Sequence, residues 1–167
     1  MKDYDTFSVS LVNDIFELTE DGLLRRRKTS SSNAKKGMIV RGYMNNGYVN
    51  TRINNREIRY HRLVWVLVYG DWPRGIIDHI DGNTSNNSII NLRLATDQNN
   101  SWNSKAKSTN KTGFKGVSFK EQYRKFGANI MHNKKQIFLG YFDKSEDARA
   151  AYVKAAKNLF GEFARTK

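Results

Sequence analysis

The chain of 167 residues carries a formal net charge of +13, contains no cysteine, and is 38% hydrophobic and 12% aromatic. This composition predicts one ordinary folded domain or two small ones, and it excludes disulfides and a thiolate zinc site. No apolar run approaches the roughly 18 residues of a membrane span, and the acidic N-terminus lacks a signal-peptide core, so we expect a cytoplasmic protein with no membrane partner.

The positive charge is concentrated in two blocks. Residues 25–62 contain eleven Lys and Arg against a single Glu, and residues 105–167 contain fifteen against five acidic residues. Residues 63–104 between them are slightly acidic, which suits a bound cation. Two basic blocks on either side of such a centre favour a nucleic-acid partner held along its backbone. A basic surface that serves only solubility is the alternative.

The first third of the chain predicts short strands joined by turns. Residues 15–18 and 22–26 fit two strands, and the Ser-, Asn- and Lys-rich residues 28–37 fit a mobile loop. Residues 47–53 and 56–60 flank Asn54-Asn55, which tolerates positive φ, and therefore predict a β-hairpin. Alternation gives this hairpin a packing face and a polar face toward a groove; the first holds Val49, Thr51 and Ile53, and the second Tyr48, Asn50 and Arg52.

The middle of the chain predicts a helix followed by a strand, a loop, a strand and a helix. Residues 61–70 are almost continuously apolar, and we favour a helix over a strand there. Residues 76–80 and 89–94 fit strands, and the residues between them fit a polar loop. Thr96 followed by Asp97 is typical of a helix N-terminus.

The last third predicts a small sheet and one long helix. Residues 104–112 are polar and basic without apolar periodicity, and therefore mark a domain boundary. Three strand-like runs follow at 115–119, 126–131 and 136–142. The final helix begins with Ser145 as its cap and ends at Gly161. Its apolar face has helical spacing and consists of Ala148, Ala151, Tyr152, Ala155, Ala156, Leu159 and Phe160.

Residues 78–100 contain the groups that phosphodiester hydrolysis at neutral pH requires. His79 is a candidate general base, because a neutral imidazole can take a proton from water near pH 7. Asp78 and Asn100 offer hard oxygen ligands that suit Mg²⁺ or Mn²⁺ and are poor for Zn²⁺. Asn91 could bond the backbone across the loop 81–88 and so fix the His79 ring. A structural Asp-His pair beside an Asn-rich turn is the alternative.

The same stretch resembles the HNH endonuclease family, with bacteriophage homing enzymes as its nearest members. The residues that carry the resemblance, from about Leu18 to Asn103, are Tyr60-His61-Arg62-Leu63-Val64-Trp65, Asp71-Trp72-Pro73, Ile77-Asp78-His79-Ile80-Asp81-Gly82-Asn83, Asn86-Asn87, Asn91-Leu92-Arg93 and Asn100. The resemblance implies a ββα-metal core at about 74–103.

By this resemblance each motif residue takes a role in cleavage. His79 is the general base, Asn91 the central Asn and Asp78 a metal ligand. Asn100, with Asn99 as its rival, replaces the His of the colicin-like branch, which favours Mg²⁺ over zinc. His61 either contacts phosphate or supports helix packing.

The C-terminal part, residues 110–164, resembles the APETALA/ethylene-response DNA-binding domain. The resemblance lies in Thr112-Gly113-Phe114-Lys115-Gly116-Val117-Ser118, Ile137-Phe138-Leu139-Gly140-Tyr141-Phe142-Asp143, Glu146-Asp147-Ala148 and the run from Ala155 to Ala164. It implies a three-stranded antiparallel sheet packed on one helix, with the sheet in the major groove. This chain has fewer Arg and Trp on the strands than the plant domains. The groove-facing candidates are Lys115, Ser118, Lys120, Arg124, Lys125, Asn129 and Lys135.

Together these features predict an α+β fold with an HNH nuclease domain at 1–103, a basic linker at 104–111 and a DNA-binding domain at 112–167. We expect a monomeric, metal-dependent, site-specific endonuclease of the homing type that nicks double-stranded DNA, located in the host cytoplasm if it is phage-encoded. The hairpin would hold DNA through Arg52 and Arg59. The alternatives are a catalytically inactive DNA-binding transcriptional regulator and an RNA-binding protein.

Overall fold

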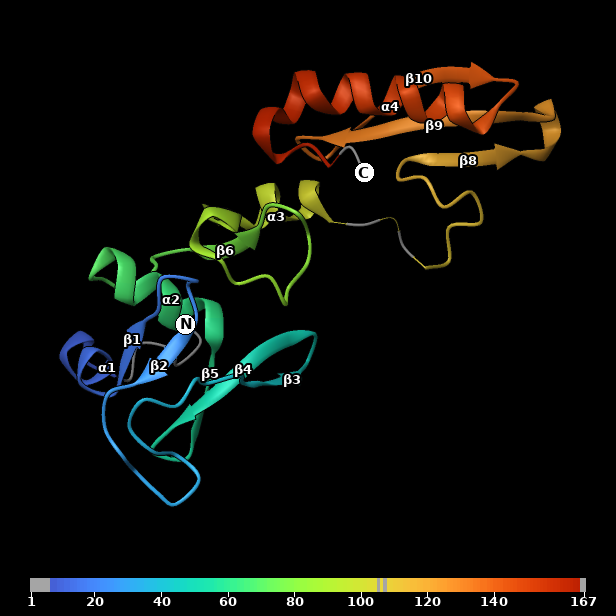
Figure 1. The fold of residues 1–167 in the computed structure, drawn as a ribbon. Helices are drawn as coiled ribbons and strands as arrows, with labels where there is room; N and C mark the ends of the chain where they lie inside the picture. The colour runs from blue at the N-terminus through green and yellow to red at the C-terminus, as the bar shows by residue number, and fades with distance from the viewer. Residues whose placement is uncertain (1–6, 105, 107, 166–167) are drawn as a thin grey trace. The chain divides into compact units, whose positions relative to one another are not determined.

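The computed structural model describes residues 7–104, 106 and 108–165 (Figure 1). The chain divides into two compact units, Met1–Thr96 and Asp97–Lys167. This division falls before the last helix of the predicted nuclease domain, and the predicted domain and linker bounds remain predictions. Within the described ranges, no helix is both long enough and apolar enough to cross a membrane.

The first unit begins with a helix that the sequence analysis missed. Helix α1 (Val9–Ile15) starts where the Ser8 hydroxyl accepts the Leu11 N–H, and it buries Val12. Strands β1 (Phe16–Leu18) and β2 (Leu24–Arg26) then pair antiparallel, which confirms the two strands expected there.

A three-stranded antiparallel sheet follows, with the order β3 (Tyr43–Asn45), β4 (Tyr48–Ile53), β5 (Arg56–Arg59). Asn54 and Asn55 have φ of 49° and 63°, so the predicted hairpin and its turn are confirmed. The side chains that face the core are Thr51, Ile53 and Ile58. Strand β3 was not predicted, because its three residues lack an alternating pattern.

Helix α2 (Tyr60–Tyr69) packs at the centre of this unit. Leu63, Val64 and Val66 are fully buried, and Gly70 ends the helix at φ 71°. The predicted helix is confirmed. Its first residue, Tyr60, connects the helix to the β1–β2 hairpin, because the Tyr60 hydroxyl accepts the Leu24 N–H at 2.7 Å.

The next pair of strands is β6 (Ile76–His79) and β7 (Leu92–Ala95), which run antiparallel. The second strand starts three residues later than predicted, because η1 (Ile89–Asn91) forms a single 3₁₀ turn. Helix α3 (Asp97–Asn103) comes next in the chain. The order strand–loop–strand–helix is as predicted, whereas the packing of α3 on this pair remains a prediction because α3 belongs to the other unit.

The second unit holds a three-stranded antiparallel sheet with the order β10 (Lys135–Phe142), β9 (Lys125–His132), β8 (Val117–Lys120). The turn η2 (Glu121–Tyr123) joins β8 to β9. Helix α4 (Ser145–Phe160) runs along the sheet in Figure 1, and η3 (Gly161–Phe163) follows it. The helix side chains buried against the strands are Ala148, Tyr152, Ala156 and Phe160.

The ends of α4 test two predictions. Gly161 ends the helix as expected. Ser145 does not cap it, because Ser145 is already the first helical residue and Lys144 stands at the cap position without a side-chain hydrogen bond. The prediction of the cap was therefore wrong by one residue.

Helix α3 packs on α4 and is hydrogen-bonded to the segment that precedes β8. The ring of Trp102 stacks on Phe160 with centroids 4.3 Å apart and planes 11° apart. The Lys115 ammonium donates to the carbonyls of Ser101, Trp102 and Ser104 at 2.9, 2.8 and 3.0 Å. Because the last carbonyls of a helix lack partners within it, Lys115 acts as a C-terminal cap for α3.

Candidate active site

His79 is the last residue of β6, and only 4% of its surface is exposed. Its Nε2 lies 3.0 Å from the Oδ1 atom of Asn87, which is also buried. The Asn87 amide nitrogen donates to the Ser85 carbonyl at 3.4 Å, and this turns its oxygen toward the imidazole. An amide oxygen only accepts hydrogen bonds, so Nε2 carries the proton and Nδ1 carries the lone pair that a general base needs.

Asn87 was not among the predicted site residues. The available signal was the Asn86-Asn87 pair in the motif, but such pairs are also ordinary turn material. Only the folded loop shows which of the two amides meets the imidazole.

Asn91 closes the loop that separates the two strands. Its Oδ1 accepts the Asp81 N–H at 3.0 Å, and its Nδ2 donates to the Asn86 carbonyl at 2.8 Å and to Asp81 Oδ1 at 3.0 Å. The expectation that Asn91 bonds the backbone across this loop is confirmed. Because the loop carries Asn87, Asn91 supports the position of the His79 ring indirectly, by holding the loop.

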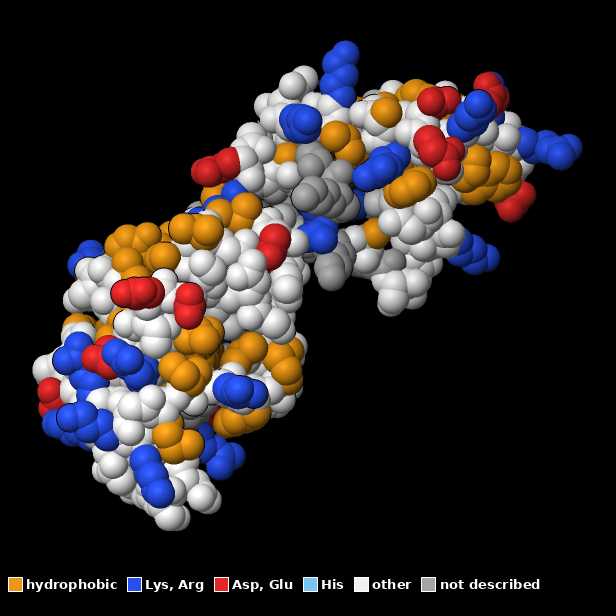
Figure 2. Space-filling view, in the orientation of Figure 1, with side chains coloured by type: hydrophobic (Ala, Val, Ile, Leu, Met, Phe, Trp, Pro, Cys, Tyr) orange, Lys and Arg blue, Asp and Glu red, His pale blue; other side chains and the backbone are white. Residues whose placement is uncertain are grey.

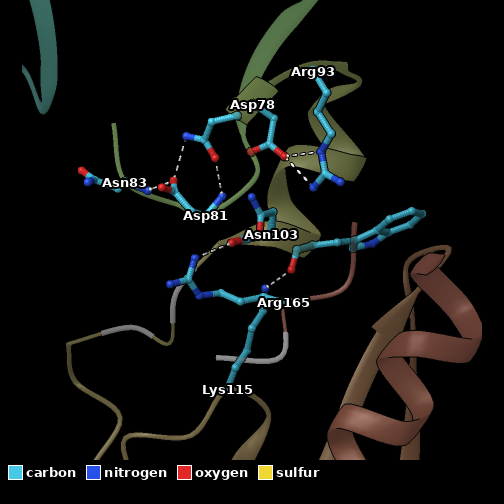
Figure 3. Close-up of polar contacts among 9 residues, drawn as sticks. Asp78, Asp81, Asn83, Arg93, Asn103, Lys115 and Arg165 are labelled. Carbon is cyan, nitrogen blue, oxygen red and sulfur yellow. Dashed lines mark hydrogen bonds and ion pairs between the residues drawn. The ribbon is translucent and has the colours of Figure 1, made fainter. Parts of the chain in front are cut away.

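Asp81 is a structural carboxylate of the same loop. It accepts the Asn83 N–H at 2.7 Å (Figure 3), and it also accepts the Asn86 amide at 2.8 Å. Burial alone would raise its pKa, but the hydrogen bonds from Asn83, Asn86 and Asn91 outweigh burial and lower the pKa of Asp81 below its usual value. Asp81 is therefore ionised and holds the loop in shape.

Asp78 lies directly opposite Arg93 in the β6–β7 register. Its Oδ2 accepts from Arg93 Nε at 2.9 Å and from Nη2 at 2.8 Å, and both side chains are almost fully covered (Figure 3). The guanidinium balances the carboxylate charge where water is scarce. Asp78 is thus held rigidly one residue before His79.

The predicted metal ligands are oxygen donors, which are typical of sites for hard cations. No three His, Cys, Asp or Glu side chains gather to hold a metal ion in the part of the chain that the structure describes. A carboxylate at Asp78 and an amide at Asn100 suit Mg²⁺, which keeps several waters and takes substrate phosphate oxygens as ligands. Asn100 and its rival Asn99 lie on α3 in the second unit, so an ion shared with Asp78 remains a prediction.

His61 lies in the first turn of α2 with 2% of its surface exposed. Its ring meets the His79 ring edge to face, with centroids 5.1 Å apart and planes at 83°, and it meets the Tyr48 ring at 5.5 Å. Burial, and then the charges of His79, Arg59 and Arg62, lower the pKa of His61 to about 3. His61 is therefore neutral at working pH, and its covered position fits support of the His79 ring.

The polar face of the β3–β4–β5 sheet leads toward His79. The Arg59 guanidinium lies over the Tyr48 ring at 4.2 Å, and the Tyr48 centroid is 6.2 Å from that of His79. Arg52 is farther along the strand, where its Nε donates to the Tyr43 hydroxyl at 3.2 Å. Of the two predicted hairpin contacts, Arg59 is thus nearer to the candidate base.

The predicted DNA contacts of the second unit occupy different surfaces. Strand alternation puts Ser118, Lys120, Lys125 and Asn129 on the sheet face opposite α4, because the residues between them pack against the helix. This face is called the outer face below. Arg124 lies in the turn before β9 at φ 50°.

Two other candidates are placed elsewhere. The Lys115 ammonium is used to cap α3, where burial, and then the charge of Arg165, lower the pKa of Lys115 to about 8. We therefore do not retain Lys115 as a DNA contact. Lys135 pairs with His132, whose ring lies 6.1 Å from that of Phe160, so the register puts Lys135 on the helix side of the sheet.

Comparisons with known proteins agree with this site. The HNH endonuclease family matches residues 59–102. The chain is 37% identical over 108 residues to Protein 3.8 of Escherichia phage T7, an overlap covering 64% of this chain and 88% of that protein. It is 41% identical over 113 residues to the uncharacterised HNH endonuclease L560 of Acanthamoeba polyphaga mimivirus, covering 65% of this chain and 56% of that protein.

A third similar protein is YosQ of the SPbeta prophage in Bacillus subtilis strain 168, provisionally named an HNH homing endonuclease. It is 32% identical over 84 residues, which cover 50% of this chain and 48% of YosQ. The chain thus spans about half of the length of L560 and of YosQ. No solved structure matches the chain. The family match extends over His61, Asp78, His79, Asn91 and Asn100, so this region of the chain is similar to HNH endonucleases.

Proposed function

We propose that the protein is a site-specific endonuclease of the homing type that nicks double-stranded DNA with His79 as the general base. The observation that supports this most strongly is the His79–Asn87 hydrogen bond, which leaves the lone pair on Nδ1. An imidazole that is oriented through Nε2 and lies beside an ordered carboxylate suits the activation of water by Nδ1.

The chain's own residues account for the proton transfer. His79 Nδ1 takes a proton from water while the water oxygen bonds to phosphorus, and the bond from phosphorus to the leaving oxygen breaks. Asn87 Oδ1 accepts from Nε2–H throughout and thereby stabilises the imidazolium that forms. Asn91 keeps the loop that carries Asn87 in place.

HNH nucleases generally depend on a divalent metal ion. Here Asp78 and Asn100 would hold Mg²⁺ or Mn²⁺, which when bound supplies stabilisation for negative charge on the leaving oxygen. The Asp78–Arg93 ion pair keeps the carboxylate in one orientation. With few protein ligands, metal affinity should depend on the phosphate of the substrate.

Duplex DNA would be held by both basic blocks. In the first unit the contacts are Arg59 and, farther along the hairpin, Arg52. In the second unit the sheet would enter the major groove, with Ser118, Lys120, Arg124, Lys125 and Asn129 as contacts and Lys135 at the edge. One candidate base in a monomer favours nicking over double-strand cleavage, and the protein would act in the host cytoplasm.

A supercoiled-plasmid assay tests this function. In the presence of Mg²⁺ or Mn²⁺ and a plasmid that carries the target, the purified protein should convert supercoiled DNA to the nicked form, and EDTA should stop the reaction. Plasmids carrying fragments of the host genome allow the target to be found. Binding of duplex DNA without cleavage under either metal ion would instead favour a DNA-binding regulator.

A further inference from the structure

The outer face of the sheet in the second unit carries a cluster of exposed aromatic rings, formed by Tyr123, Phe138 and Tyr141. The Tyr141 centroid lies 4.7 Å from that of Tyr123 and 4.8 Å from that of Phe138. Their exposed fractions are 49% for Tyr123, 53% for Phe138 and 41% for Tyr141. Exposed apolar groups that gather in this way commonly mark a binding surface.

A β-bulge puts two of these rings on the same face. Phe138 pairs with Asn129 and Gly140 pairs with Ala128, so the register shifts at the residue between them. Phe138 and Tyr141, three residues apart, therefore both point away from α4. Without the bulge, an odd spacing would send them to opposite faces of the sheet.

Gly127 provides the space beneath the cluster. A Cβ atom at this position would lie 3.5 Å from the Tyr141 ring and 3.4 Å from the Lys120 side chain. Both side chains therefore extend across Gly127 on the outer face. The apolar core of the unit lies on the other side of the sheet, where Val117, Ala128 and Ala148 pack together.

The polar groups around the rings indicate what the face binds. Asn129 and Gln136 supply amides on the outer face, and Lys120 and Lys125 supply positive charge at its end. None of the strand residues on this face, all of which the structure describes, is acidic or an arginine. On the face of the second unit that Figure 2 draws, hydrophobic, Lys/Arg and Asp/Glu side chains all lie at the surface.

Base pairs differ in the groups that they present in the major groove. Guanine is read by Arg or Lys, adenine by the amide of Asn or Gln, and thymine by apolar contact with its 5-methyl group. The middle of this face holds rings and amides, with lysines only at its end, and therefore suits A·T pairs. Its lysines suit the flanking phosphates.

We propose that the outer face recognises A·T-rich duplex DNA in the major groove, with Phe138 and Tyr141 against thymine methyl groups and Asn129 toward adenine. This inference rests on the proposed function, because it assumes that the second unit binds duplex DNA. It adds the base composition of the target, which the nuclease motif does not specify.

The test replaces thymine with uracil, which removes only the methyl groups. Equilibrium binding of the full chain, in EDTA and at one salt concentration, is measured on three duplexes of equal length: A·T-rich, the same sequence with deoxyuridine for thymidine, and G·C-rich. The A·T-rich duplex should bind most tightly. For each methyl group that is buried against a ring, the protein should bind the deoxyuridine duplex roughly fourfold more weakly.

Variants connect this effect to the rings. Phe138→Ala and Tyr141→Ala should each reduce the ratio between the thymidine and deoxyuridine duplexes. Phe119→Ala is the matched control, because Phe119 is a similarly exposed ring that pairs with Phe126 on the helix side of the sheet, and it should leave the ratio unchanged.

Two results would overturn the inference, and they have different meanings. Tight, salt-dependent binding that ignores the methyl groups would refute the thymine contact while the proposed nuclease stands. Absence of binding to all three duplexes would refute both, because neither proposal survives without duplex DNA binding. Since the substitution lies in the DNA, the wild-type comparison does not depend on how any variant folds.

Discussion

Asn87 accepts a hydrogen bond from His79 Nε2 over 3.0 Å and so determines which imidazole nitrogen can act as a base. The Ser85 carbonyl in turn orients the Asn87 amide. A loop that looks like ordinary turn sequence thus contributes a positioning residue to the candidate active site.

Asn87→Ala should lower the single-turnover cleavage rate by about 10- to 100-fold, because the His79 ring loses its tautomer and orientation. DNA affinity should change little. Asn87→Asp keeps an acceptor oxygen and should restore part of the rate. Equal rates for the alanine variant and the wild type would remove Asn87 from the mechanism.

His79→Ala should abolish cleavage while the affinity for duplex DNA stays within about twofold, since a general base contributes to the rate and little to ground-state binding. Plasmid nicking and a filter-binding or anisotropy assay on the same preparation provide the two measurements. A large loss of affinity, with cleavage falling in proportion, would indicate a structural His79 instead.

Arg93→Ala should destabilise the first unit by about 3 kcal/mol, because the buried Asp78 carboxylate would lose its counter-charge. Urea unfolding measures this change. The matched control is Arg74→Ala: Arg74 is almost fully exposed beside Asp71, at 3.9 Å, and should change the free energy of unfolding by less than about 0.5 kcal/mol. Similar losses for both variants would mean that burial of the pair is unimportant.

His61 should make the protein sensitive to acid. Its pKa is about 3 in the folded protein against the ordinary 6.5, so below pH 6.5 the unfolded chain binds a proton that the folded chain does not. Stability is therefore fully present above pH 6.5 and is lost as the pH falls toward 3. Relative to His61→Phe, the wild type should lose about 2 kcal/mol between pH 7 and pH 5. A difference that does not vary with pH would contradict the buried, neutral imidazole.

Much of the fold follows from local patterns in the sequence. The hairpin was predictable because Asn54-Asn55 fits only a few turns, and α4 because its apolar spacing is helical over four turns. Helix α1 and strand β3 are too short to show a periodic pattern, and the exposed β3 depends on its pairing with β4. The predicted strand from Ile89 was wrong for its first three residues, which form the short 3₁₀ turn η1 instead.

The candidate site was predictable as residue types but not as contacts. The motif indicates Asp78, His79 and Asn91, yet the Arg93 partner of Asp78 depends on strand register, and the Asn87 partner of His79 depends on the path of the loop. Lys115 shows the opposite case. A lysine at the start of a predicted groove-facing strand resembles a DNA contact until the fold brings three carbonyls to its ammonium.

Gly116→Ala should selectively destabilise the second unit. A Cβ atom there would lie 2.3 Å from the Tyr152 ring and 2.4 Å from the Asn129 carbonyl oxygen, and φ is already 74°. Overpacking and backbone strain together should cost about 3 kcal/mol or more, seen as a lower midpoint for a unit-specific unfolding transition. Gly113 also has a positive φ, at 72°, but a Cβ atom there would meet nothing within 4 Å. Gly113→Ala should therefore lower the free energy of unfolding by the backbone strain alone, about 1 kcal/mol. Gly116 contacts Asn129 on β9, a strand of the outer face, so only Gly116→Ala should also weaken DNA binding. Equal losses of stability in the two variants would contradict the close packing at Tyr152.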